Sequence, residues 1–157
     1  MEIIYHNRKP NTEAEEMLNA RLVSFDELLR SSDVLSVHCA LNEQTKGMFN
    51  STTFSKMKPT SIFINTARGG IHDEQDLGEA LHNGLIWGAG LDVTNPEPMA
   101  NNPLLSMPNV AILPHIGSAT IEARSEMSRL AAPNIVEYYR NGNIPNLVNP
   151  EALSIHE

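Results

Sequence analysis

Three short segments between residues 60 and 120 place the tightest constraint on how this chain can fold. Each contains or follows a run of mostly apolar residues typical of a buried strand, and each presents polar residues where that strand would end. The segments cover residues 64–70, 90–98 and 113–120. In a parallel α/β sheet, ligands bind just outside the carboxyl ends of the strands. We therefore predict that Arg68, Glu97 and His115 converge at one edge of one sheet, as an acid/base site for a carboxylated substrate.

The rest of the chain alternates between strand-like and helix-like stretches. The expected strands cover residues 2–6, 21–23, 33–39, 61–65, 86–93 and 110–113. Thr12 and Ser24 are the expected caps of the first two helices. Asp73 and Ser118 are expected to open two further helices, the second of them closed by Asn141 and Gly142, with one or two short helices within 45–57 and an irregular tail from residue 143. Strands that alternate with helices in this way predict βαβ units, and hence an α/β fold with a parallel sheet and helices on both faces.

Charge and composition exclude several classes of function. The net charge is -8, which argues against a nucleic-acid partner because phosphates require a basic surface. The single cysteine, Cys39, excludes an internal disulfide and fits a reducing compartment. No apolar run reaches the roughly 18 residues that span a bilayer, and the first residues are too polar for a signal peptide. We expect a cytoplasmic protein with no membrane partner and, from the spacing of its histidines and cysteine, no metal site.

Each candidate residue also has a structural explanation. The guanidinium of Arg68 can bind a carboxylate through two parallel hydrogen bonds, or it can form an ion pair with a loop carboxylate. His115 can give and take a proton near neutrality, or it can be a structural histidine. Glu97 lies between Pro96 and Pro98 in a stiff loop and is the natural partner for His115. These alternatives stay open on the residues alone.

Two further positions bear on a cofactor. Arg8 follows the first expected strand, where a dinucleotide-binding fold has an acid for the ribose of NAD or a nearby arginine for the 2′-phosphate of NADP. No acid stands there, although the pattern also fits a solvated turn. Asp92 ends a buried strand and could accept a hydrogen bond from a ligand amide or cap the next turn. The pair Gly88 and Gly90 does not lead into a helix, so it is not a phosphate loop, and no G-x-G-x-x-G occurs in the sequence.

Taken together, these segments resemble the D-isomer-specific 2-hydroxyacid dehydrogenases, most closely their glyoxylate reductase/hydroxypyruvate reductase branch. The resemblance covers nearly the whole chain. It is carried by Phe63-Ile64-Asn65-Thr66-Ala67-Arg68-Gly69, by Ala89-Gly90-Leu91-Asp92-Val93-Thr94-Asn95-Pro96-Glu97-Pro98 and by Ile112-Leu113-Pro114-His115-Ile116-Gly117-Ser118-Ala119-Thr120.

The resemblance implies a role for each candidate residue. Arg68 would hold the carboxylate or carbonyl of a small 2-oxo acid, His115 would protonate the carbonyl oxygen, and Glu97 would pair with His115. NADP(H) is the implied cofactor, with NAD(H) as the second choice, and a homodimer follows by analogy. The implied cofactor-binding residues are Arg8, Cys39, Ala40, Thr45, Thr66, Ala67, Arg68, Asp92, His115, Gly117 and Ser118. Ala40 departs from the family, which often has proline there.

The resemblance also implies a missing part. Members of the family have a substrate-binding domain and a first βα unit with a glycine-rich phosphate loop, whereas this chain begins at the second strand of the order 3-2-1-4-5-6. We expect an incomplete Rossmann-type sheet whose strands 2 and 3 are separated from strands 4, 5 and 6, with two unpaired edges. The expected domains are a partial NAD(P)-binding domain over 1–142 and a C-terminal tail over 143–157.

Three interpretations of such a chain stay open. The first is a truncated NADPH-dependent 2-hydroxyacid dehydrogenase that is weak or inactive alone. The second is a non-enzymatic remnant or interaction module of the same fold, which associates with a partner or a full-length relative. The third is a piece of a longer natural protein, for which an in-frame G-x-G-x-x-G upstream would restore the full enzyme.

Overall fold

The computed structural model describes residues 1–151. The chain divides into two compact units, Met1–His115 and Ile116–Glu157. The division falls between residues 115 and 116, and the domain boundary predicted after residue 142 stays a prediction.

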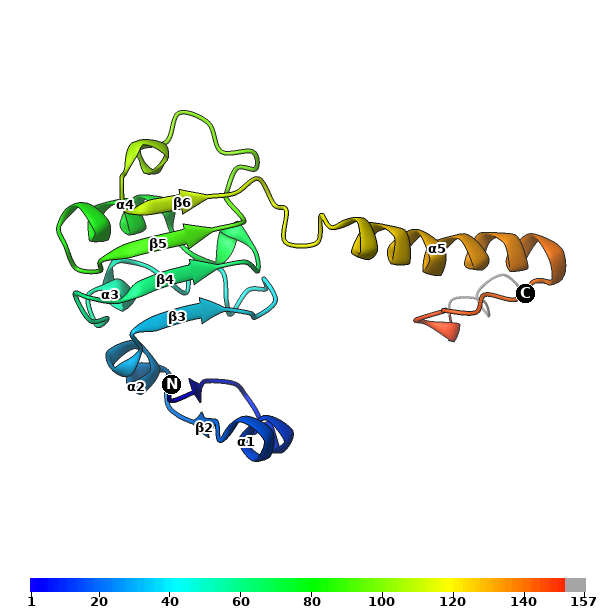
Figure 1. Ribbon diagram of the computed structural model, residues 1–157, viewed down its shortest axis with the longest axis horizontal. Coiled ribbons are helices and arrows are strands. Elements are labelled where there is room, and N and C mark those ends of the chain that lie inside the picture. Colours follow the sequence, from blue (N-terminus) through cyan, green and yellow to red (C-terminus); the bar gives the residue numbers. More distant parts are fainter. Residues whose placement is uncertain (152–157) are drawn as a thin grey trace. The chain divides into compact units, whose positions relative to one another are not determined.

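The first unit contains two parallel sheets (Figure 1). The smaller sheet pairs β1 (Ile4–Tyr5) with β2 (Arg21–Leu22). The larger sheet has the order β3-β4-β5-β6, formed by β3 (Val34–Val37), β4 (Ile62–Asn65), β5 (Gly88–Leu91) and β6 (Val110–Ile112). The α/β fold with a parallel, incomplete sheet is therefore confirmed.

The separation of the first two strands from the others is confirmed as well. Among the described residues, β1 pairs with β2 and β3 pairs with β4, and no strand pairing joins the two sheets. Aromatic contacts connect them instead: the ring of Phe25 lies 5.6 Å from the ring of His6, which follows β1, and 5.8 Å from that of Phe49 in the core. The sheet is thus interrupted at the position that the first strand occupies in the family's strand order.

Short helices and turns connect the strands of the first unit. They are α1 (Thr12–Leu18), α2 (Phe25–Ser31), α3 (Ser51–Phe54), α4 (Glu74–His82) and the 3-10 turns η1 (Gly69–Ile71) and η2 (Pro103–Ser106). Ser24 and Asp73 cap α2 and α4 as predicted. The predicted cap of α1 is wrong: the side chain of Asn11 accepts the hydrogen bond from the amide of Ala14, and Thr12 is the first helical residue.

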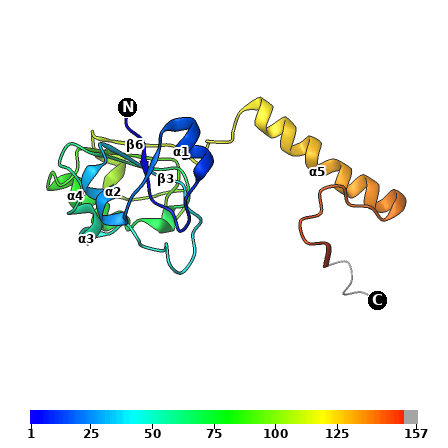
Figure 2. The ribbon, with the colours of Figure 1, turned by 90° about the horizontal axis from the view of Figure 1, so that it is seen from below.

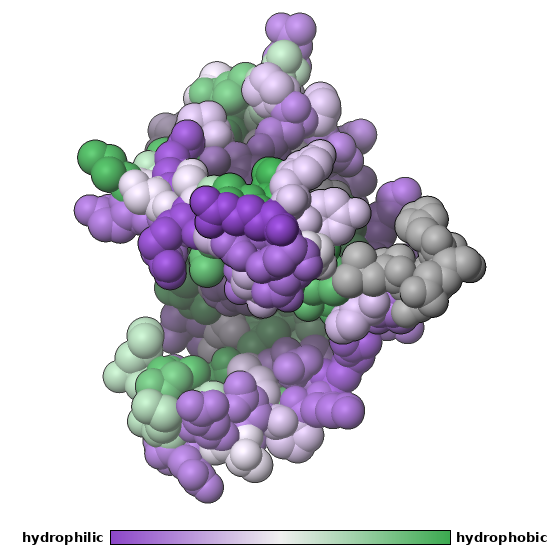
Figure 3. All heavy atoms as spheres, turned by 90° about the vertical axis from the view of Figure 1, so that its right-hand side faces the viewer, coloured by the Kyte–Doolittle hydropathy of each residue, from purple (hydrophilic) through white to green (hydrophobic). Residues whose placement is uncertain are grey.

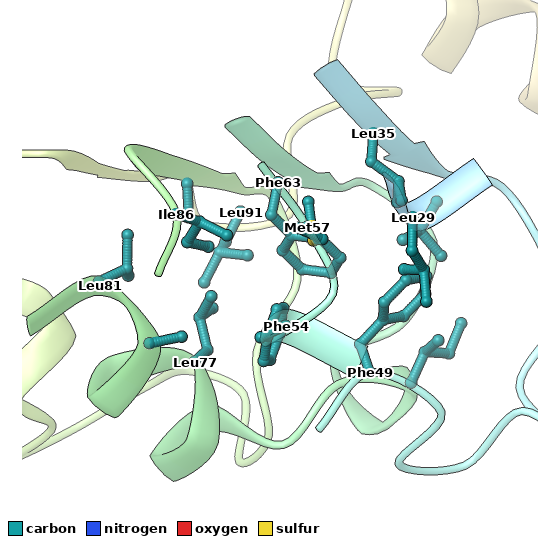
Figure 4. Close-up of a cluster of buried hydrophobic side chains, with 14 of the residues drawn as sticks. Leu29, Leu35, Phe49, Phe54, Met57, Phe63, Leu77, Leu81, Ile86 and Leu91 are labelled. Atoms are coloured by element: carbon teal, nitrogen blue, oxygen red, sulfur yellow. The ribbon is translucent and has the colours of Figure 1, made fainter. Parts of the chain in front are cut away.

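The core lies on one face of the larger sheet, beneath α2, α3 and α4 (Figures 2 and 4). Three phenylalanines fill its centre. Phe54 from α3 and Phe63 from β4 are fully buried and stack edge to face at 5.3 Å, and Phe49 lies 5.0 Å from Phe63. Each such side chain contributes about 1.5–3 kcal/mol by burial. This packing fixes β4, and with it the segment that carries Arg68.

The opposite face of the larger sheet carries a shallow, mostly apolar groove of about 350 Å³. Ile62 and Ile64 of β4, the exposed Trp87 and both glycines of β5 are among the residues that line it. Helices α2, α3 and α4 therefore pack on one face, and within the first unit the second face is partly open.

The second unit is built on one long helix, α5 (Ile121–Asn141). Its cap is Thr120, whose side chain accepts from the amide of Ala123, so the predicted start at Ser118 is wrong by two residues. The helix ends, as predicted, at Asn141 and Gly142, where Gly142 has a φ of 76° that favours glycine. Residues 143–149 form turns and irregular chain, as predicted, and the end of the predicted tail, 152–157, lies outside the described residues.

Candidate active site

The candidate site lies along the carboxyl edge of the larger sheet. The register places Val37, Asn65, Leu91 and Ile112 opposite one another on neighbouring strands, so the loops that follow all begin at one level. Arg68, Glu97 and His115 all stand in or after these loops, and their convergence on one substrate stays a prediction. Figure 3 looks at the molecule from the side toward which the strand arrows of Figure 1 point, and hydrophilic and hydrophobic residues lie side by side on the surface it displays.

Glu97 and His115 form a hydrogen-bonded pair at this edge. The Nδ1 atom of His115 lies 2.6 Å from Oε1 of Glu97, and the two side chains are 43% and 39% exposed. Nδ1 must carry a proton to donate to the carboxylate, which leaves Nε2 as the ring nitrogen that can face a substrate. His115 has a φ of 56°, in the left-handed region that histidine tolerates better than most residues. The backbone after β6 is thus bent at the position where the imidazole meets Glu97.

Arg68 stands on a tight turn organised by Asn65. The side-chain oxygen of Asn65 accepts from the amide of Ala67 at 2.9 Å, and its amide nitrogen donates to the carbonyl of Arg68 at 2.9 Å. The same nitrogen contacts Nδ1 of His72 at 2.9 Å. Asn65 is fully buried, whereas Arg68 is exposed and its guanidinium donates to the carbonyl of Ala67 at 2.7 Å. The turn is rigid while the charged group remains accessible.

His72 is a buried partner of this turn that sequence reasoning missed. Its side chain is 3% exposed and packs edge-on against Phe63 at 5.7 Å. Burial lowers the pKa of His72 to about 4, against the opposing effect of the Asp73 charge. The neutral ring accepts from Asn65 through Nδ1, so the proton is on Nε2, which is buried and has no hydrogen-bond partner within residues 1–151. The sequence feature that could have indicated a buried histidine is its position between Ile71 and Asp73, the cap of α4.

Gly69 brings the Arg68 turn against the loop that carries Glu97. A Cβ atom on Gly69 would lie 2.1 Å from the carbonyl oxygen of Thr94, far closer than any real contact. A glycine is therefore required for the close approach of two backbones. The Arg68 turn and the start of the Glu97 loop are in direct contact, although the hydrogen bond of the guanidinium is to Ala67 and not to the Glu97–His115 pair.

The predicted cofactor residues Cys39, Ala40 and Thr45 share the loop after β3. The hydroxyl of Thr45 donates to the carbonyl of Ala40 at 2.7 Å and accepts from the amide of Asn42 at 2.8 Å, which closes the loop. Burial raises the pKa of the Cys39 thiol. Ala40 is exposed, and Cys39 is half-buried two residues beyond the end of β3. These residues lie on the same edge as Thr66 and Ala67.

The other predicted cofactor residues divide between the two sheets and the second unit. Asp92 directly follows β5, is 6% exposed, and its amide donates to the carbonyl of Asn65 at 3.0 Å. Thr66 is exposed beyond the end of β4. Arg8 is exposed near the end of β1, in the smaller sheet, and its amide donates to the side chain of Asn7. Gly117 and Ser118 belong to the second unit.

Neither a metal-binding cluster nor a membrane-spanning helix is present within residues 1–151. No group of three or more His, Cys, Asp or Glu side chains within residues 1–151 is arranged to hold a metal ion. In the same part of the chain, every helix is too short or too polar to cross a bilayer.

The family assignment follows from comparison with known sequences. Residues 1–117 match the family model described as D-isomer specific 2-hydroxyacid dehydrogenase, NAD binding domain. The chain belongs to the D-isomer-specific 2-hydroxyacid dehydrogenase family. The predicted resemblance is thereby confirmed, and the matched region ends just beyond His115.

Individual relatives agree with this assignment. The chain is 47% identical over 153 residues to glyoxylate/hydroxypyruvate reductase B of Klebsiella pneumoniae subsp. pneumoniae, which covers 96% of the chain and 47% of the relative. It is 44% identical over 154 residues to glyoxylate reductase of Thermococcus litoralis, which covers 98% of the chain and 46% of the relative. The chain therefore spans about half the length of the curated relatives that it matches.

Solved structures show the same fold. A glyoxylate reductase from Paecilomyes thermophila superposes with a TM-score of 0.83 at 42% identity and covers 97% of this chain and 46% of that one. A D-isomer specific 2-hydroxyacid dehydrogenase from Lactobacillus delbrueckii ssp. bulgaricus, solved as an NAD complex, gives 0.84 at 28% identity and covers 94% of this chain and 49% of that one.

Proposed function

We propose that this chain carries the acid/base and carboxylate-binding half of an NADPH-linked reductase for a small 2-oxo acid, glyoxylate or hydroxypyruvate. The observation that carries the proposal is the 2.6 Å contact between His115 and Glu97 at the carboxyl edge of the sheet. The names of the relatives, glyoxylate reductase and glyoxylate/hydroxypyruvate reductase, support the substrate class.

In this proposal His115 is the proton donor. Its Nδ1–H is held by Glu97, so a second proton resides on Nε2 when the ring is charged. Nε2 gives that proton to the carbonyl oxygen of the 2-oxo acid, and the oxygen becomes the hydroxyl of the 2-hydroxy acid. The carboxylate of Glu97 accepts the hydrogen bond from Nδ1 and so keeps Nε2 as the nitrogen that gives the proton. In the reverse reaction neutral Nε2 accepts the hydroxyl proton.

Arg68 is the proposed anchor for the substrate carboxylate. Its guanidinium is exposed, and the buried Asn65 fixes the turn on which it stands. A planar guanidinium presents parallel N–H groups that match both oxygens of a carboxylate, and this fixes the orientation of the carbonyl next to it. Gly69 keeps the turn against the Glu97 loop, so anchor and acid belong to adjoining segments.

The residues at the sheet edge fit a nicotinamide cofactor. When bound, the cofactor supplies the hydride for the carbonyl carbon. Exposed Thr66, the half-buried Ala67 and buried Asp92 follow β4 and β5 at the level of His115 and would line the nicotinamide. Arg8 near the end of β1, with no acid beside it, would bind the 2′-phosphate of NADPH and disfavour NADH. Cys39, Ala40 and Thr45 would border the same cofactor.

We further propose that the 157-residue chain by itself is weak or inactive. The interruption between β1 and β3 supports this, as does the lack of a G-x-G-x-x-G among these residues, because the pyrophosphate normally lies on a glycine loop and helix N-terminus. A cytoplasmic location and a homodimer accompany the proposal, from the single cysteine and from family analogy.

A hybrid enzyme tests the function. Residues 1–157 would replace the matching part of the Klebsiella pneumoniae reductase, and oxidation of NADPH would be followed with glyoxylate and with hydroxypyruvate. We expect turnover with NADPH that exceeds turnover with NADH, and no turnover by the 157-residue chain alone. A hybrid with a native circular-dichroism spectrum that turns over neither acid would refute the proposal, and ordinary rates from the chain alone would refute its inactivity.

A second candidate function rests on the open edges of the two sheets. Among the described residues, β1 and β3 each have one edge that pairs with no strand, and such edges are templates for pairing with another chain, which suits an interaction module that associates with a full-length relative. Size-exclusion chromatography of the chain mixed with a tagged reductase would test this. Co-elution that displaces the reductase from its own oligomer would favour the interaction module, and separate elution would exclude it.

A further inference from the structure

One carboxylate ties down both ends of the loop that carries Glu97. The amide of Asn95 donates to Oε1 of Glu74 at 2.6 Å, and the side-chain amide of Asn102 donates to Oε2 of Glu74 at 2.9 Å. Glu97 lies between these two tethered positions, Asn95 and Asn102, in the sequence. The Glu74 side chain therefore closes the 95–102 loop at its base.

Besides the stiffness of its prolines, this loop is held at its two ends: Gly69 packs against Thr94 at the start, and the side chain of Asn102 caps η2 at the finish. Pro96 and Pro98 flank Glu97 and have no backbone N–H to donate. Residues 95–98 are exposed, so burial does not hold them. The hydroxyl of Thr94 donates to the carbonyl of Pro96 at 2.8 Å, and Met99 packs against the core. The two bonds to Glu74 add to these contacts in fixing the loop.

Glu74 is itself rigidly placed. It is the first residue of α4, directly after the cap Asp73, and α4 is anchored by Leu77, which is fully buried. The same segment begins with the Arg68 turn and continues through η1. Partial burial raises the pKa of Glu74, while the bonds from Asn95 and Asn102 oppose this by favouring the carboxylate. Residues 68–74 therefore run continuously from the Arg68 turn through η1 to Glu74, which bonds to the Glu97 loop.

We propose that Glu74 is a positioning residue that holds Glu97 against His115. Its effect on catalysis rests on the proposed function, but the contact between Glu97 and His115 that it controls can be measured without catalysis. Glu74 acts through Glu97 and touches neither His115 nor, in this assignment, the substrate. Loss of its carboxylate leaves two N–H groups without their acceptor and loosens the loop at both tethered positions, although Asn102 still caps η2. Glu97 then spends less time within hydrogen-bond reach of Nδ1.

The tautomer of His115 reports this directly. A neutral imidazole carries its proton on Nδ1 or on Nε2, and a fixed acceptor at Nδ1 selects the first form. Two-bond ¹H–¹⁵N correlation spectra of the purified chain at pH 8 distinguish the two nitrogens. The His115→Gln spectrum identifies the His115 signals among the six histidines. In the parent chain we expect His115 to carry its proton on Nδ1.

Two variants and one control complete the experiment. Glu74→Ala removes both acceptors, and the isosteric Glu74→Gln keeps one oxygen and presents an amide to the second donor. Glu79→Ala removes the same charge from an exposed position of the same helix and serves as the matched control. We expect the Nδ1–H fraction of His115 to fall in Glu74→Ala toward that of a free imidazole, to fall partly in Glu74→Gln, and to stay unchanged in Glu79→Ala.

The outcomes separate this inference from the proposed function. Unchanged His115 nitrogen shifts in folded Glu74→Ala would overturn the positioning role. If that variant does not fold, Glu74→Gln decides in the same way. A parent chain without the Nδ1–H form would overturn the inference and remove the basis of the proposed function together. A shifted tautomer alongside an inactive, folded hybrid enzyme would leave Glu74 as the positioning residue and refute only the reductase.

Discussion

Acidification from pH 7 to pH 5 should destabilise this protein through one buried side chain, His72. Burial lowers the pKa of His72 to about 4 in the folded state, against about 6.5 for an ordinary histidine. The unfolded chain therefore takes up a proton between these values and the folded chain does not. Because the unfolded state binds more protons in this window, the free energy of unfolding falls as the pH falls. The loss begins near pH 6.5 and is complete near pH 4.

The magnitude follows from the two pKa values. A displacement from 6.5 to about 4 corresponds to a total of about 3 kcal/mol at 1.36 kcal/mol per unit, of which about 2 kcal/mol is lost between pH 7 and pH 5. Asp26, whose pKa is lowered to about 2 by Arg30 and Lys56, loses its contribution only below pH 4. The raised pKa of Glu74 acts in the opposite direction, because its folded form takes up a proton first. Both carboxylates are common to the variants compared below.

Urea unfolding followed by circular dichroism at pH 7 and pH 5 measures the effect. In His72→Leu the loss of stability between the two pH values should be smaller than in the parent by about 2 kcal/mol. His38→Gln removes an exposed histidine and should retain the parent's loss. If His72→Leu and the parent lose the same free energy, burial of a neutral His72 is not what makes this fold acid-sensitive.

Three substitutions test the site from other directions. Arg68→Gln in the hybrid enzyme should raise KM for the 2-oxo acid, since loss of a charge-assisted bidentate contact costs about 2–3 kcal/mol. The KM for NADPH should stay constant. An unchanged KM for the acid would show that Arg68 is not the anchor. Gly69→Ala should lower the free energy of unfolding in urea by about 1–3 kcal/mol, because the new Cβ would overlap the Thr94 carbonyl. Gly78→Ala should not, because the nearest neighbour of a Cβ there is 3.7 Å away. Equal effects of the two variants would contradict the close approach of Gly69 to Thr94. Arg8→Gln should reduce the preference of the hybrid for NADPH over NADH, and an unaltered ratio of kcat/KM values would exclude a 2′-phosphate contact.

The position of the site could be predicted because parallel topology places strand ends together. Strands predicted to end at Asn65, Val93 and Leu113 end in the structure at Asn65, Leu91 and Ile112, which lie opposite one another, so the loops that carry Arg68 and Glu97 begin at one edge as the topology requires. The interruption of the sheet could be predicted from the same topology, because the family's first strand lies at the centre of its sheet and has no counterpart in this sequence.

What could not be predicted depends on choices between neighbours or on distant contacts. Asn11 and Thr12 are both good caps, and the backbone selected Asn11; likewise Thr120 caps α5 in place of Ser118. The hydrogen bonds of Glu74 reach Asn95 and Asn102, which lie 21 and 28 positions further along the chain, and no local sequence pattern predicts them. Such contacts exist only once β4, α4 and the loop after β5 have packed on a common core.

The central claim is that His115, held by Glu97, gives the proton to the 2-oxo acid. The most direct test is the rate of NADPH oxidation with hydroxypyruvate by the hybrid enzyme in its parent and His115→Gln forms, at saturating substrate. A positioned acid or base contributes about 10²- to 10⁴-fold, so kcat should fall by that factor in His115→Gln while NADPH binding is retained. Equal kcat values in the two folded proteins would contradict the account.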